Sequence, residues 1–298
     1  MATFAKATFS TAGYAAFRPS YPPKLFQTVL AYHSGPKSLA LDLGCGHGLV
    51  SRALAPQFSA VIGTDPSTPM VKQASASSTA PEFKNVVFRV GSAEDLGEFE
   101  DGSLDVVVAG QAAHWFNYNK VWLEIAKKVR KGGTLAFWGY KDNYFVEYPR
   151  ATAVLDDYCY GEGDDKMGKY WEQPGRNILR DLYGDIQPPE NEWTDVKRIE
   201  YQPNTEGKES GEGEVLMESK MKLGEMEGYV RTFSAYHTWM ADHEGVEAKK
   251  DGGEGDVVDG MFEKMLEVEP DWRAKGEQWR DIEVENEWGS VILLARKK

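Results

Sequence analysis

Short apolar segments alternate with segments of helical periodicity between residues 38 and 140, and this alternation constrains the fold more than any other feature of the chain. Parallel strands need such crossover helices, because a tight turn cannot reach a parallel neighbour. We therefore predict an α/β fold, with a mostly parallel sheet and helices on both of its faces. The predicted strands are residues 39–43, 60–64, 86–90, 104–109 and 134–140. The predicted helices are residues 49–56, 69–76 and 119–130, the last of them stopped by Lys131-Gly132-Gly133.

The segments on either side of this core complete what we expect to be a single domain in three parts. Residues 1–37 should form an N-terminal arm, with a short helix near residues 24–33. Residues 38–140 form the core, and residues 141–298 form a helical cap together with the last strands of the sheet. In this third part we predict an irregular stretch at 141–193, a partly solvated loop in 206–227, strands at 196–201 and 288–296, and helices at 229–242 and 257–269.

The composition excludes several classes of protein. The chain has 34 Lys and Arg against 47 Asp and Glu, a net charge of −13, whereas nucleic-acid binding usually needs a basic face. No apolar run approaches the roughly 18–20 residues that span a bilayer, and the N-terminus lacks the pattern of a signal peptide. The two Cys cannot form a disulfide scaffold, which indicates a reducing compartment. We expect a cytoplasmic protein, a monomer or weak homodimer, that binds neither nucleic acid nor membrane.

The sharpest local signal is the Gly-rich turn Asp42-Leu43-Gly44-Cys45-Gly46-His47-Gly48, which joins the first predicted strand to the first helix. Glycine lets the backbone approach a ligand closely. The spacing differs from that of a dinucleotide-binding loop, whose third Gly falls where this chain has Leu49. Asp42 would repel a pyrophosphate, and it suits a ligand with a cationic amino-acid end.

Two more segments complete the description of this ligand. Asp65 ends the second strand, where an acidic residue accepts hydrogen bonds from ribose hydroxyls, although it could also cap the helix that begins after Pro66. Residues 91–95 follow the third strand, where they either face an adenine or form an ordinary acidic turn. A ligand with a positive amino-acid end, a ribose and an adenine is S-adenosylmethionine.

The segment from Asp42 to Asp65 resembles the cofactor-binding core of class I S-adenosylmethionine-dependent methyltransferases. The resemblance is closer still to the trans-aconitate methyltransferase subgroup best known from fungi, and it extends over nearly the whole chain. It is carried by Arg18-Pro19-Ser20-Tyr21-Pro22, Ala113-His114-Trp115-Phe116, Trp138-Gly139-Tyr140, Tyr170-Trp171-Glu172-Gln173-Pro174-Gly175-Arg176 and Tyr229-Val230-Arg231-Thr232-Phe233-Ser234-Ala235-Tyr236-His237.

The resemblance implies a Rossmann-like sheet of seven strands, and an arm that folds over the cofactor as a lid. In that arrangement Tyr14 closes over the methionine end and Arg18 pairs with the cofactor carboxylate. Gln111, after the fourth strand, either contacts the amino-acid end or simply caps the strand. The expected cofactor-binding residues are Tyr14, Arg18, Asp42, Gly44, Gly46, Gly48, Asp65, Met70, Ala93, Glu94 and Gln111.

The chain departs from the family pattern at two places. Ser92 stands where many class I enzymes have an Asp that holds the adenine, so Glu94, Asp95 or the backbone must serve. The stretch before Tyr229 is rich in Glu, where the trans-aconitate enzymes carry basic residues. The second difference bears on the substrate, because acidic residues disfavour a tricarboxylate.

His114 is the one well-placed candidate for a catalytic base, because it follows the fourth strand at the carboxyl edge of the sheet, where α/β folds bind ligands. A carboxylate acceptor is already ionised at neutral pH and needs positioning only, whereas a phenol or alcohol needs a base. His114 could otherwise orient the substrate or pack against Trp115. Cys45 reads as a small buried residue rather than a nucleophile, and the five His lack metal-ligand spacing.

The expected substrate residues come from the arm, the fourth strand and the cap. An Arg in the cap could bind a carboxylate in bidentate fashion, and the sequence predicts a structural ion pair equally well. Arg231, Tyr236 and His237 should lie on one helix, whose apolar face (residues 233, 236, 237 and 240) packs over the pocket or contacts substrate. The candidates are Tyr21, Trp115, Trp171, Arg176 and Tyr236.

The sequence therefore predicts a methyltransferase that uses S-adenosylmethionine and acts on a small molecule of secondary or general metabolism. O-methylation of a carboxylate follows the family precedent. The alternatives are S-methylation of a thiol, O-methylation of a hydroxyl, or a cofactor-binding protein without transferase activity. A nicotinamide-dependent oxidoreductase is disfavoured by Asp42 and Leu49.

Overall fold

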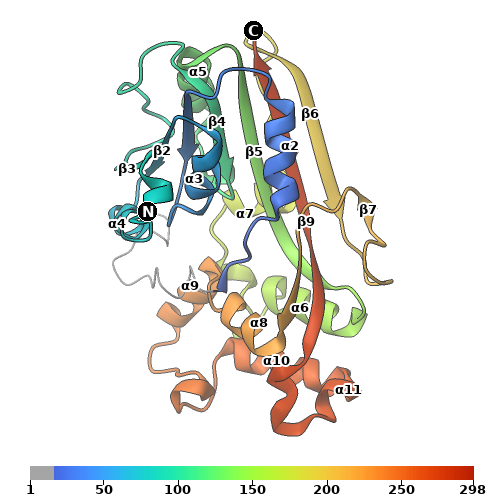
Figure 1. The fold of residues 1–298 in the computed structure, drawn as a ribbon. Helices are drawn as coiled ribbons and strands as arrows, with labels where there is room; N and C mark the ends of the chain where they lie inside the picture. The colour runs from blue at the N-terminus through green and yellow to red at the C-terminus, as the bar shows by residue number, and fades with distance from the viewer. Residues whose placement is uncertain (1–16) are drawn as a thin grey trace. The chain divides into compact units, whose positions relative to one another are not determined.

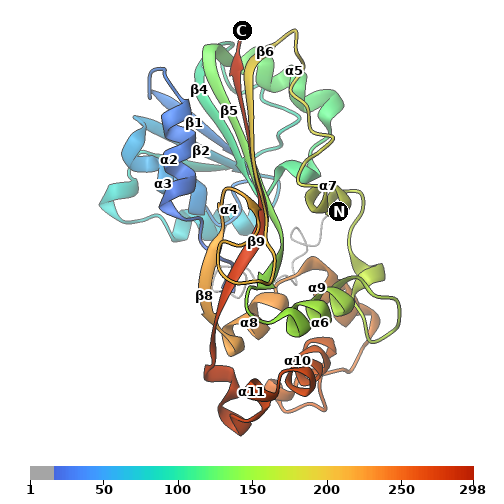
Figure 2. The same cartoon turned by 90° about the vertical axis from the view of Figure 1, so that its right-hand side faces the viewer.

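The structure is a computed structural model that describes residues 17–298, so the predictions that concern residues 1–16, Tyr14 among them, lie outside the described residues. The described chain divides into two compact units (Figures 1 and 2). The first, here the sheet unit, comprises Ser20–Lys141, Asn177–Glu200 and Ser290–Lys298. The second, here the helical unit, comprises the described residues up to Pro19, Asp142–Arg176 and Tyr201–Gly289.

The strands form a sheet in the order β3-β2-β1-β4-β5-β9-β6-β7, with β8 paired to β9. Neighbouring strands pair in parallel from β3 through β5, which confirms the predicted Rossmann-like α/β fold. The seven expected strands are β1 to β6 and β9, and the sheet has two short strands in addition. The bounds are β1 Leu39–Leu43, β2 Ala60–Asp65, β3 Val86–Val90, β4 Leu104–Gly110, β5 Val129–Phe145, β6 Trp193–Gln202, β7 Glu212–Gly213, β8 Glu218–Lys222 and β9 Glu283–Lys297.

The helices of the sheet unit connect these strands. Figure 2 shows α2 (Pro23–Tyr32) and α3 (Leu49–Leu54) on one side of the strands and α5 (Tyr118–Lys128) on the other. Helix α4 (Thr68–Ala76) follows β2 and contacts β2 and β3. The crossover helices therefore cover both faces, as the alternation of strand and helix predicts.

The core of the sheet unit is centred on β4, whose residues from Leu104 to Ala109 are all buried. A central parallel strand is covered on both faces and accordingly reads as a continuous apolar run. Asp105 is the polar exception, and its carboxylate accepts hydrogen bonds from the backbone of Ser38 and Leu39 and from Arg130. These bonds fix the amino end of β1 against β4. The glycine-rich turn follows the opposite, carboxyl end of β1.

The helical unit contains most of the remaining helices and the two short strands. Its buried apolar residues include Leu155, Tyr229, Met261 and Trp272. The elements that lie wholly within it are α6 Pro149–Tyr160, α8 Leu223–Val230, α9 Ser234–Asp242, α10 Val257–Val268, α11 Pro270–Arg273, β7 and β8. Helix α7 (Gly175–Arg180) begins in this unit, and its last residues belong to the sheet unit. None of the helices described in residues 17–298 is both long and apolar enough to cross a membrane.

The predicted end of the helix at residues 119–130 is wrong in a way that the burial of Lys128 explains. Helix α5 ends at Lys128, whose ammonium is buried and donates to the Phe99 carbonyl oxygen at 2.7 Å. Strand β5 begins at once, and the register between β4 and β5 shifts before Thr134. Gly132, with a φ of 75°, therefore lies in this irregular part of a strand instead of ending a helix.

Two further predictions of secondary structure are corrected. Residues 141–193 are not irregular, because they contain α6 and α7. Residues 229–242 form no single helix, because α8 ends at Val230 and α9 begins at Ser234. Arg231 therefore lies in the turn between two helices and not on one helix with Tyr236 and His237. The turn is closed by hydrogen bonds from the amides of residues 232 and 233 back to residues 229 and 230.

Candidate active site

The glycine-rich turn between β1 and α3 adopts a backbone that glycine favours. Gly44, Gly46 and Gly48 have φ values of 67°, 52° and 86°, all in the left-handed region. A Cβ on Gly44 would lie 2.5 Å from the Cβ of Ala112, the second residue after β4. A Cβ on Gly46 would have no atom of the described residues within 4 Å. The turn is thus packed against the end of β4 at one glycine and open at another.

Asp42 lies at the carboxyl end of β1 with one oxygen satisfied and one not. Its Oδ2 accepts a hydrogen bond from the Ser51 hydroxyl at 2.6 Å, whereas its Oδ1 is buried without a partner among the described residues. Burial raises the pKa of the Asp42 carboxyl to about 7 against the lowering effect of Ser51, and the nearby Asp65 adds to the rise. A buried acceptor that lacks a donor is costly, so this position suits a ligand that supplies a donor or a positive charge.

Asp65 organises the backbone around the turn. Its Oδ2 accepts from the amide of Gly46 at 2.9 Å, and its Oδ1 accepts from the amide of Ser67 at 2.8 Å. Burial raises the pKa of Asp65, although the two backbone amides oppose the rise. Each carboxylate oxygen keeps a second lone pair, so both can also accept hydroxyl donors. The bond to Ser67, just before α4, shows that Asp65 also fixes the start of this helix.

Cys45 is inert in this setting. Its thiol is buried within the turn, and burial together with the negative charges of Asp42 and Asp65 raises the pKa of this thiol well above its usual value. A thiolate is required for nucleophilic chemistry. This result agrees with the interpretation of Cys45 as a small buried residue.

In the turn after β3, both oxygens of the Glu94 carboxylate already accept hydrogen bonds from the protein. The Ser92 hydroxyl donates to one oxygen of Glu94, and the amide of Asn117 donates to the other at 2.8 Å. Glu94 thus ties the turn after β3 to the start of α5. Ala93 is buried, as is Met70 on α4. An adenine contact by the Glu94 carboxylate would have to share these oxygens with two protein donors.

Gln111 bridges the ends of β4 and β5. Its side-chain oxygen accepts from the amide of Tyr140, and its side-chain nitrogen donates to the Tyr140 carbonyl oxygen, each at 2.8 Å. Its backbone amide donates to the Trp138 carbonyl oxygen at 2.8 Å, with a φ of 55°. The side chain of Gln111 therefore acts as a strand-end cap, one of the two roles that the sequence allowed for it.

His114 and Trp115 lie in a short 3-10 helix, Ala113–Trp115, just after the residues that pack against the glycine-rich turn. The imidazole of His114 is buried, and its centre lies 4.8 Å from the ring centre of Trp115, which is 37% exposed. On another side the imidazole stacks on Tyr183, with centres 6.3 Å apart and planes 28° apart. The predicted base thus contacts two aromatic rings.

Tyr21 and Arg18 belong to different units. Tyr21 packs edge-on against Phe26, Trp138 and Tyr140 at ring-centre distances of 5.7–6.3 Å. Arg18 is in the helical unit, where its Nη2 donates to the Thr232 carbonyl oxygen at 3.3 Å. The contacts of Arg18 with a cofactor and of Tyr21 with a substrate remain predictions.

Trp171 and Arg176 form a cluster with Tyr160 and Asp142 in the helical unit. The guanidinium of Arg176 lies 3.9 Å above the Trp171 ring, which stacks on Tyr160. Arg176 donates through Nη2 to both Asp142 and the Tyr160 hydroxyl. Its Nε is buried without a partner among the described residues. Arg176 is thus part of an ion pair, one of its two predicted roles, and it retains one unsatisfied donor.

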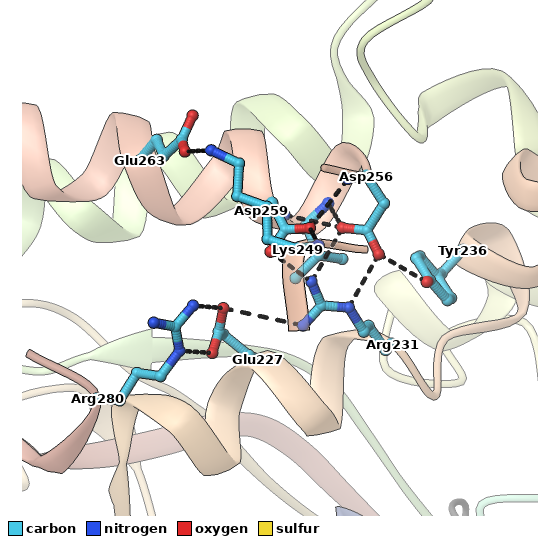
Figure 3. A network of polar contacts seen from close by, with 9 residues as sticks. Glu227, Arg231, Tyr236, Lys249, Asp256, Asp259, Glu263 and Arg280 are labelled. Carbon is cyan, nitrogen blue, oxygen red and sulfur yellow. Dashed lines mark hydrogen bonds and ion pairs between the residues drawn. The ribbon is translucent and has the colours of Figure 1, made fainter. Parts of the chain in front are cut away.

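Tyr236 has a structural partner. Its hydroxyl donates to Asp256 at 2.7 Å, within the buried ion-pair network of Figure 3. Arg231 donates to both oxygens of Asp256 at 2.9 and 3.0 Å and to Asp259 at 2.9 Å. Asp256 also accepts the first amides of α10, so it fixes the start of this helix. The substrate contact predicted for the Tyr236 hydroxyl therefore competes with a buried carboxylate.

Sequence reasoning missed three residues of the sheet unit that matter to this site. Ser51 satisfies one oxygen of Asp42, Ala112 contacts Gly44, and Tyr183 supports His114. No spacing rule identifies them, because each contact joins residues whose proximity depends on the folded sheet.

The site fits S-adenosylmethionine on its own chemistry. The unpartnered oxygen of Asp42 matches an ammonium donor, the oxygens of Asp65 match hydroxyl donors, and the open position at Gly46 leaves room beside the backbone. A cation near Asp42 would also offset the cost of ionising this buried carboxyl.

Comparisons with known proteins agree with this chemistry. Residues 41–137 match the family described as "Methyltransferase domain". The chain is 28% identical over 296 residues to a yeast protein, the "Probable S-adenosylmethionine-dependent methyltransferase CRG1" of Saccharomyces cerevisiae, with 97% of this chain and 96% of the relative covered. It is 29% identical to a protein of Dictyostelium discoideum assigned as a methyltransferase, over 76% of each chain.

A solved structure extends the agreement to the fold. A protein of Anaeromyxobacter dehalogenans assigned as a type II methyltransferase matches with a TM-score of 0.67 and 25% identity, over 94% of this chain and 98% of the other. With the glycine-rich turn and its two carboxylates, these findings lead to one conclusion. The chain carries a class I S-adenosylmethionine-dependent methyltransferase domain, and the protein is an enzyme whose methyl donor is S-adenosylmethionine.

Proposed function

We propose that this enzyme O-methylates the carboxylate of a small metabolite, such as trans-aconitate or a related acid. The contact between Ala112 and Gly44 is the observation that supports our choice of where methyl transfer takes place. This contact joins the segment containing His114 and Trp115 to the turn that we assign to the cofactor. The choice of a carboxylate follows the resemblance to the trans-aconitate subgroup.

The cofactor supplies an electrophilic methyl group on a sulfonium, so the chain has to bind and align an acceptor. We assign the amino-acid end to Asp42 and the glycine-rich turn, and the ribose to Asp65. We assign the adenine side to Met70, Ala93 and Glu94. From the resemblance alone, Tyr14 and Arg18 remain expected cofactor residues. Exclusion of water and fixed orientation are then the main catalytic contributions, since alignment alone is worth many orders of magnitude in rate.

His114 has a role that depends on the acceptor. A carboxylate with a pKa near 4 is ionised at pH 7, so His114 would orient it by hydrogen bonding and would remove no proton. A phenol or alcohol would instead need His114 as a general base. Trp115, partly exposed beside it, offers an apolar surface for the acceptor. Tyr21 is our third candidate for acceptor contact in the sheet unit.

An observation in the helical unit also supports an anionic acceptor. The Nε–H of Arg176 is buried and has no acceptor among the described residues, although the guanidinium already pairs with Asp142. A carboxylate oxygen would satisfy this donor. We therefore retain Arg176 and its neighbour Trp171 as substrate residues, and Tyr236 through its ring only.

The test is a competition assay read by mass spectrometry. The full chain and S-adenosylmethionine are mixed with trans-aconitate, monocarboxylic acids, phenols and small dithiols. We expect a gain of one methyl mass on an acid, and we expect His114→Gln to slow the reaction without abolishing it. Methylation of a thiol or phenol with the acids untouched would overturn the carboxylate assignment. Cofactor binding without transfer to any acceptor would indicate a binding protein.

A further inference from the structure

The end of helix α7 has an unusual backbone that sequence patterns do not reveal. The amide of Tyr183 donates to the Ile178 carbonyl oxygen and the amide of Leu182 donates to the Leu179 carbonyl oxygen, at 2.9 and 3.0 Å. This pair of bonds is the Schellman motif, in which the left-handed residue is usually Gly. Here it is Leu182, with a φ of 48°, and the next residue, Tyr183, is also left-handed at 64°. Two successive non-glycine residues in this region are strained and mark a place where the surroundings dictate the backbone.

This backbone carries the side chain of Tyr183 into the core of the sheet unit. The residue is fully buried, and its hydroxyl donates to the carbonyl oxygen of Trp138 in β5 at 3.2 Å. The path of this hydroxyl depends on Gly139, where an added Cβ would lie 2.4 Å from the Tyr183 oxygen. Leu179 would also be met, at 2.9 Å. The chain thus leaves a space at residue 139 that the Tyr183 hydroxyl occupies.

The same Trp138 carbonyl oxygen receives a second donor from another strained residue. The amide of Gln111, with a φ of 55°, donates to it at 2.8 Å. Gln111 starts the segment that leads to His114, and Tyr183 stacks on the imidazole of His114. Gln111 and Tyr183, both with a left-handed backbone, therefore donate to the same carbonyl oxygen of β5, and each is linked to His114, one along the chain and one through its ring.

We propose that Tyr183 is a positioning residue for His114: its ring is the surface on which the imidazole rests, and its hydroxyl anchors that surface to β5 through the space at Gly139. The proposal rests on the assignment of His114 to the acceptor site. Tyr183 itself touches no reacting atom in this scheme. Packing alone would not require the hydroxyl bond to Trp138, because a Phe would fill nearly the same volume.

The first test observes the imidazole directly and needs no methyl acceptor. An aromatic ring stacked on His114 shifts the proton resonances of its imidazole, which His114→Gln assigns among the five His of the chain. We expect Tyr183→Leu to remove the contribution of the Tyr183 ring and leave that of Trp115, and Tyr183→Phe to change the resonance less. Gly139→Ala should move the resonance without altering either residue. Tyr32→Leu is the matched control, because Tyr32 is a buried tyrosine of the same unit whose hydroxyl also donates to a backbone carbonyl, that of Asp195.

The second test separates positioning from folding. For Tyr183→Leu and Gly139→Ala we expect kcat to fall about 10- to 100-fold, the cost of a misplaced catalytic group, with the Kd for S-adenosylmethionine unchanged within about 3-fold. Tyr183→Phe, which keeps the ring and removes the hydroxyl anchor, should lower kcat by a smaller factor, about 3- to 10-fold. An unshifted His114 resonance in Gly139→Ala and Tyr183→Leu would overturn the proposal, whether or not the enzyme is active. A shifted resonance with unchanged kcat would leave Tyr183 as a support for His114 and would reject His114 as the acceptor residue.

Discussion

Asp42 is the residue of this site whose charge depends most on what binds beside it. Its buried carboxyl has a pKa of about 7 in the ligand-free protein, because burial opposes ionisation more strongly than the Ser51 hydroxyl favours it. A sulfonium or ammonium nearby favours the ionised form. The sequence pattern pointed to Asp42 and Asp65, since each lies at the carboxyl end of a strand in a recognisable strand–helix repeat.

Binding of S-adenosylmethionine should therefore release protons. The cationic ligand lowers the pKa of Asp42 from about 7, so a bound proton leaves when binding occurs near pH 6.5. The affinity should weaken as the pH falls below 7. Calorimetry in two buffers of different ionisation enthalpy measures the number of protons, which should approach zero in Asp42→Asn. Equal proton release by this variant and the native chain would contradict the assignment.

The same residue should make the ligand-free fold less stable as the pH rises. The pKa of Asp42 is higher when folded (about 7) than when unfolded (3.8), so its contribution is fully present below about pH 4 and is lost as the pH passes 7. Asp42→Asn removes this loss, and at pH 8 it should raise the free energy of unfolding by up to about 4 kcal/mol. Chemical denaturation at pH 5 and pH 8 checks this. Parallel pH profiles for the two proteins would contradict it.

Tyr183 shows where prediction from single residues stops. Its role depends on a left-handed backbone at Leu182 and Tyr183 and on a missing side chain at Gly139. No periodicity or motif marks a left-handed Leu or Tyr, because neither residue type favours that conformation. The contact with His114 also joins residues far apart in sequence, which no local pattern encodes.

At the scale of elements, two glycines of the glycine-rich turn allow fold stability and cofactor binding to be tested separately. Gly44→Ala places a methyl group 2.5 Å from Ala112 and should lower the free energy of unfolding by about 2–4 kcal/mol through overpacking and a left-handed alanine. Gly46→Ala meets no described atom, so it should cost only about 1–2 kcal/mol while weakening cofactor binding more than tenfold. Denaturation and cofactor titration of both variants give the comparison. The reverse order of stability would be inconsistent with this packing.

The ion pairs among α8, α9 and α10 make a second prediction at this scale. Arg231→Met leaves the buried carboxylates of Asp256 and Asp259 without their partner and should cost about 3–5 kcal/mol. Arg280→Met removes a half-exposed arginine from the buried Glu227, which keeps Arg231 at 3.8 Å, so it should cost less, about 1–3 kcal/mol, and is the comparison variant. Urea denaturation measures both variants.

The pH dependence of the Arg231 effect has a definite sign. Although burial opposes ionisation, Arg231 and the backbone amides hold the pKa of Asp256 below its usual value. This carboxylate therefore contributes stability above about pH 4, and the contribution is lost as the pH falls through its lower folded pKa. The cost of Arg231→Met should shrink at pH 3. A cost that stays constant with pH would argue against the ionic origin of the effect.

The bounds of strands and helices were predicted well where one hydrophobic periodicity dominates the segment, and poorly where tertiary contacts determine where the element ends. Strands β1 and β3 have the predicted bounds, because each apolar run ends at a turn. The end of α5 was misplaced because a buried Lys128, satisfied by a distant carbonyl oxygen, looks like a solvent-facing residue in sequence. The break between α8 and α9 was missed because residues 231–233 include no Gly or Pro to announce it.

At the scale of the whole molecule, the net charge of −13 acts on every charged substrate. An anionic acceptor is repelled at long range, and salt screens this repulsion beyond about 8 Å at physiological ionic strength. For a carboxylate acceptor, kcat/KM should therefore rise, by up to about tenfold, between 10 and 150 mM salt. A neutral acceptor serves as the control and should show no rise. A fall in kcat/KM for the acid would indicate a locally basic approach that outweighs the net charge.

The fold class and the cofactor could be predicted from the sequence because they depend on repeated local patterns at the carboxyl edge of one sheet. The acceptor could not, because acceptor specificity depends on side chains of several segments, such as Trp115 and Arg176, whose partners are set by tertiary structure. Tyr21, Trp115 and Trp171 each contact other rings of their own unit, and several of those rings also belong to the core.

The most direct measurement of the central claim is the chemical stability of the transferred methyl group. The full chain is given S-adenosylmethionine labelled in its methyl group, together with the acid methylated in the competition assay, and the product is treated with mild alkali. A methyl ester hydrolyses and releases the label as methanol, whereas a thioether or an aryl ether keeps it. We predict quantitative release of the label. Retention of the label on the product would contradict carboxylate methylation and would require a base for which His114 is the candidate.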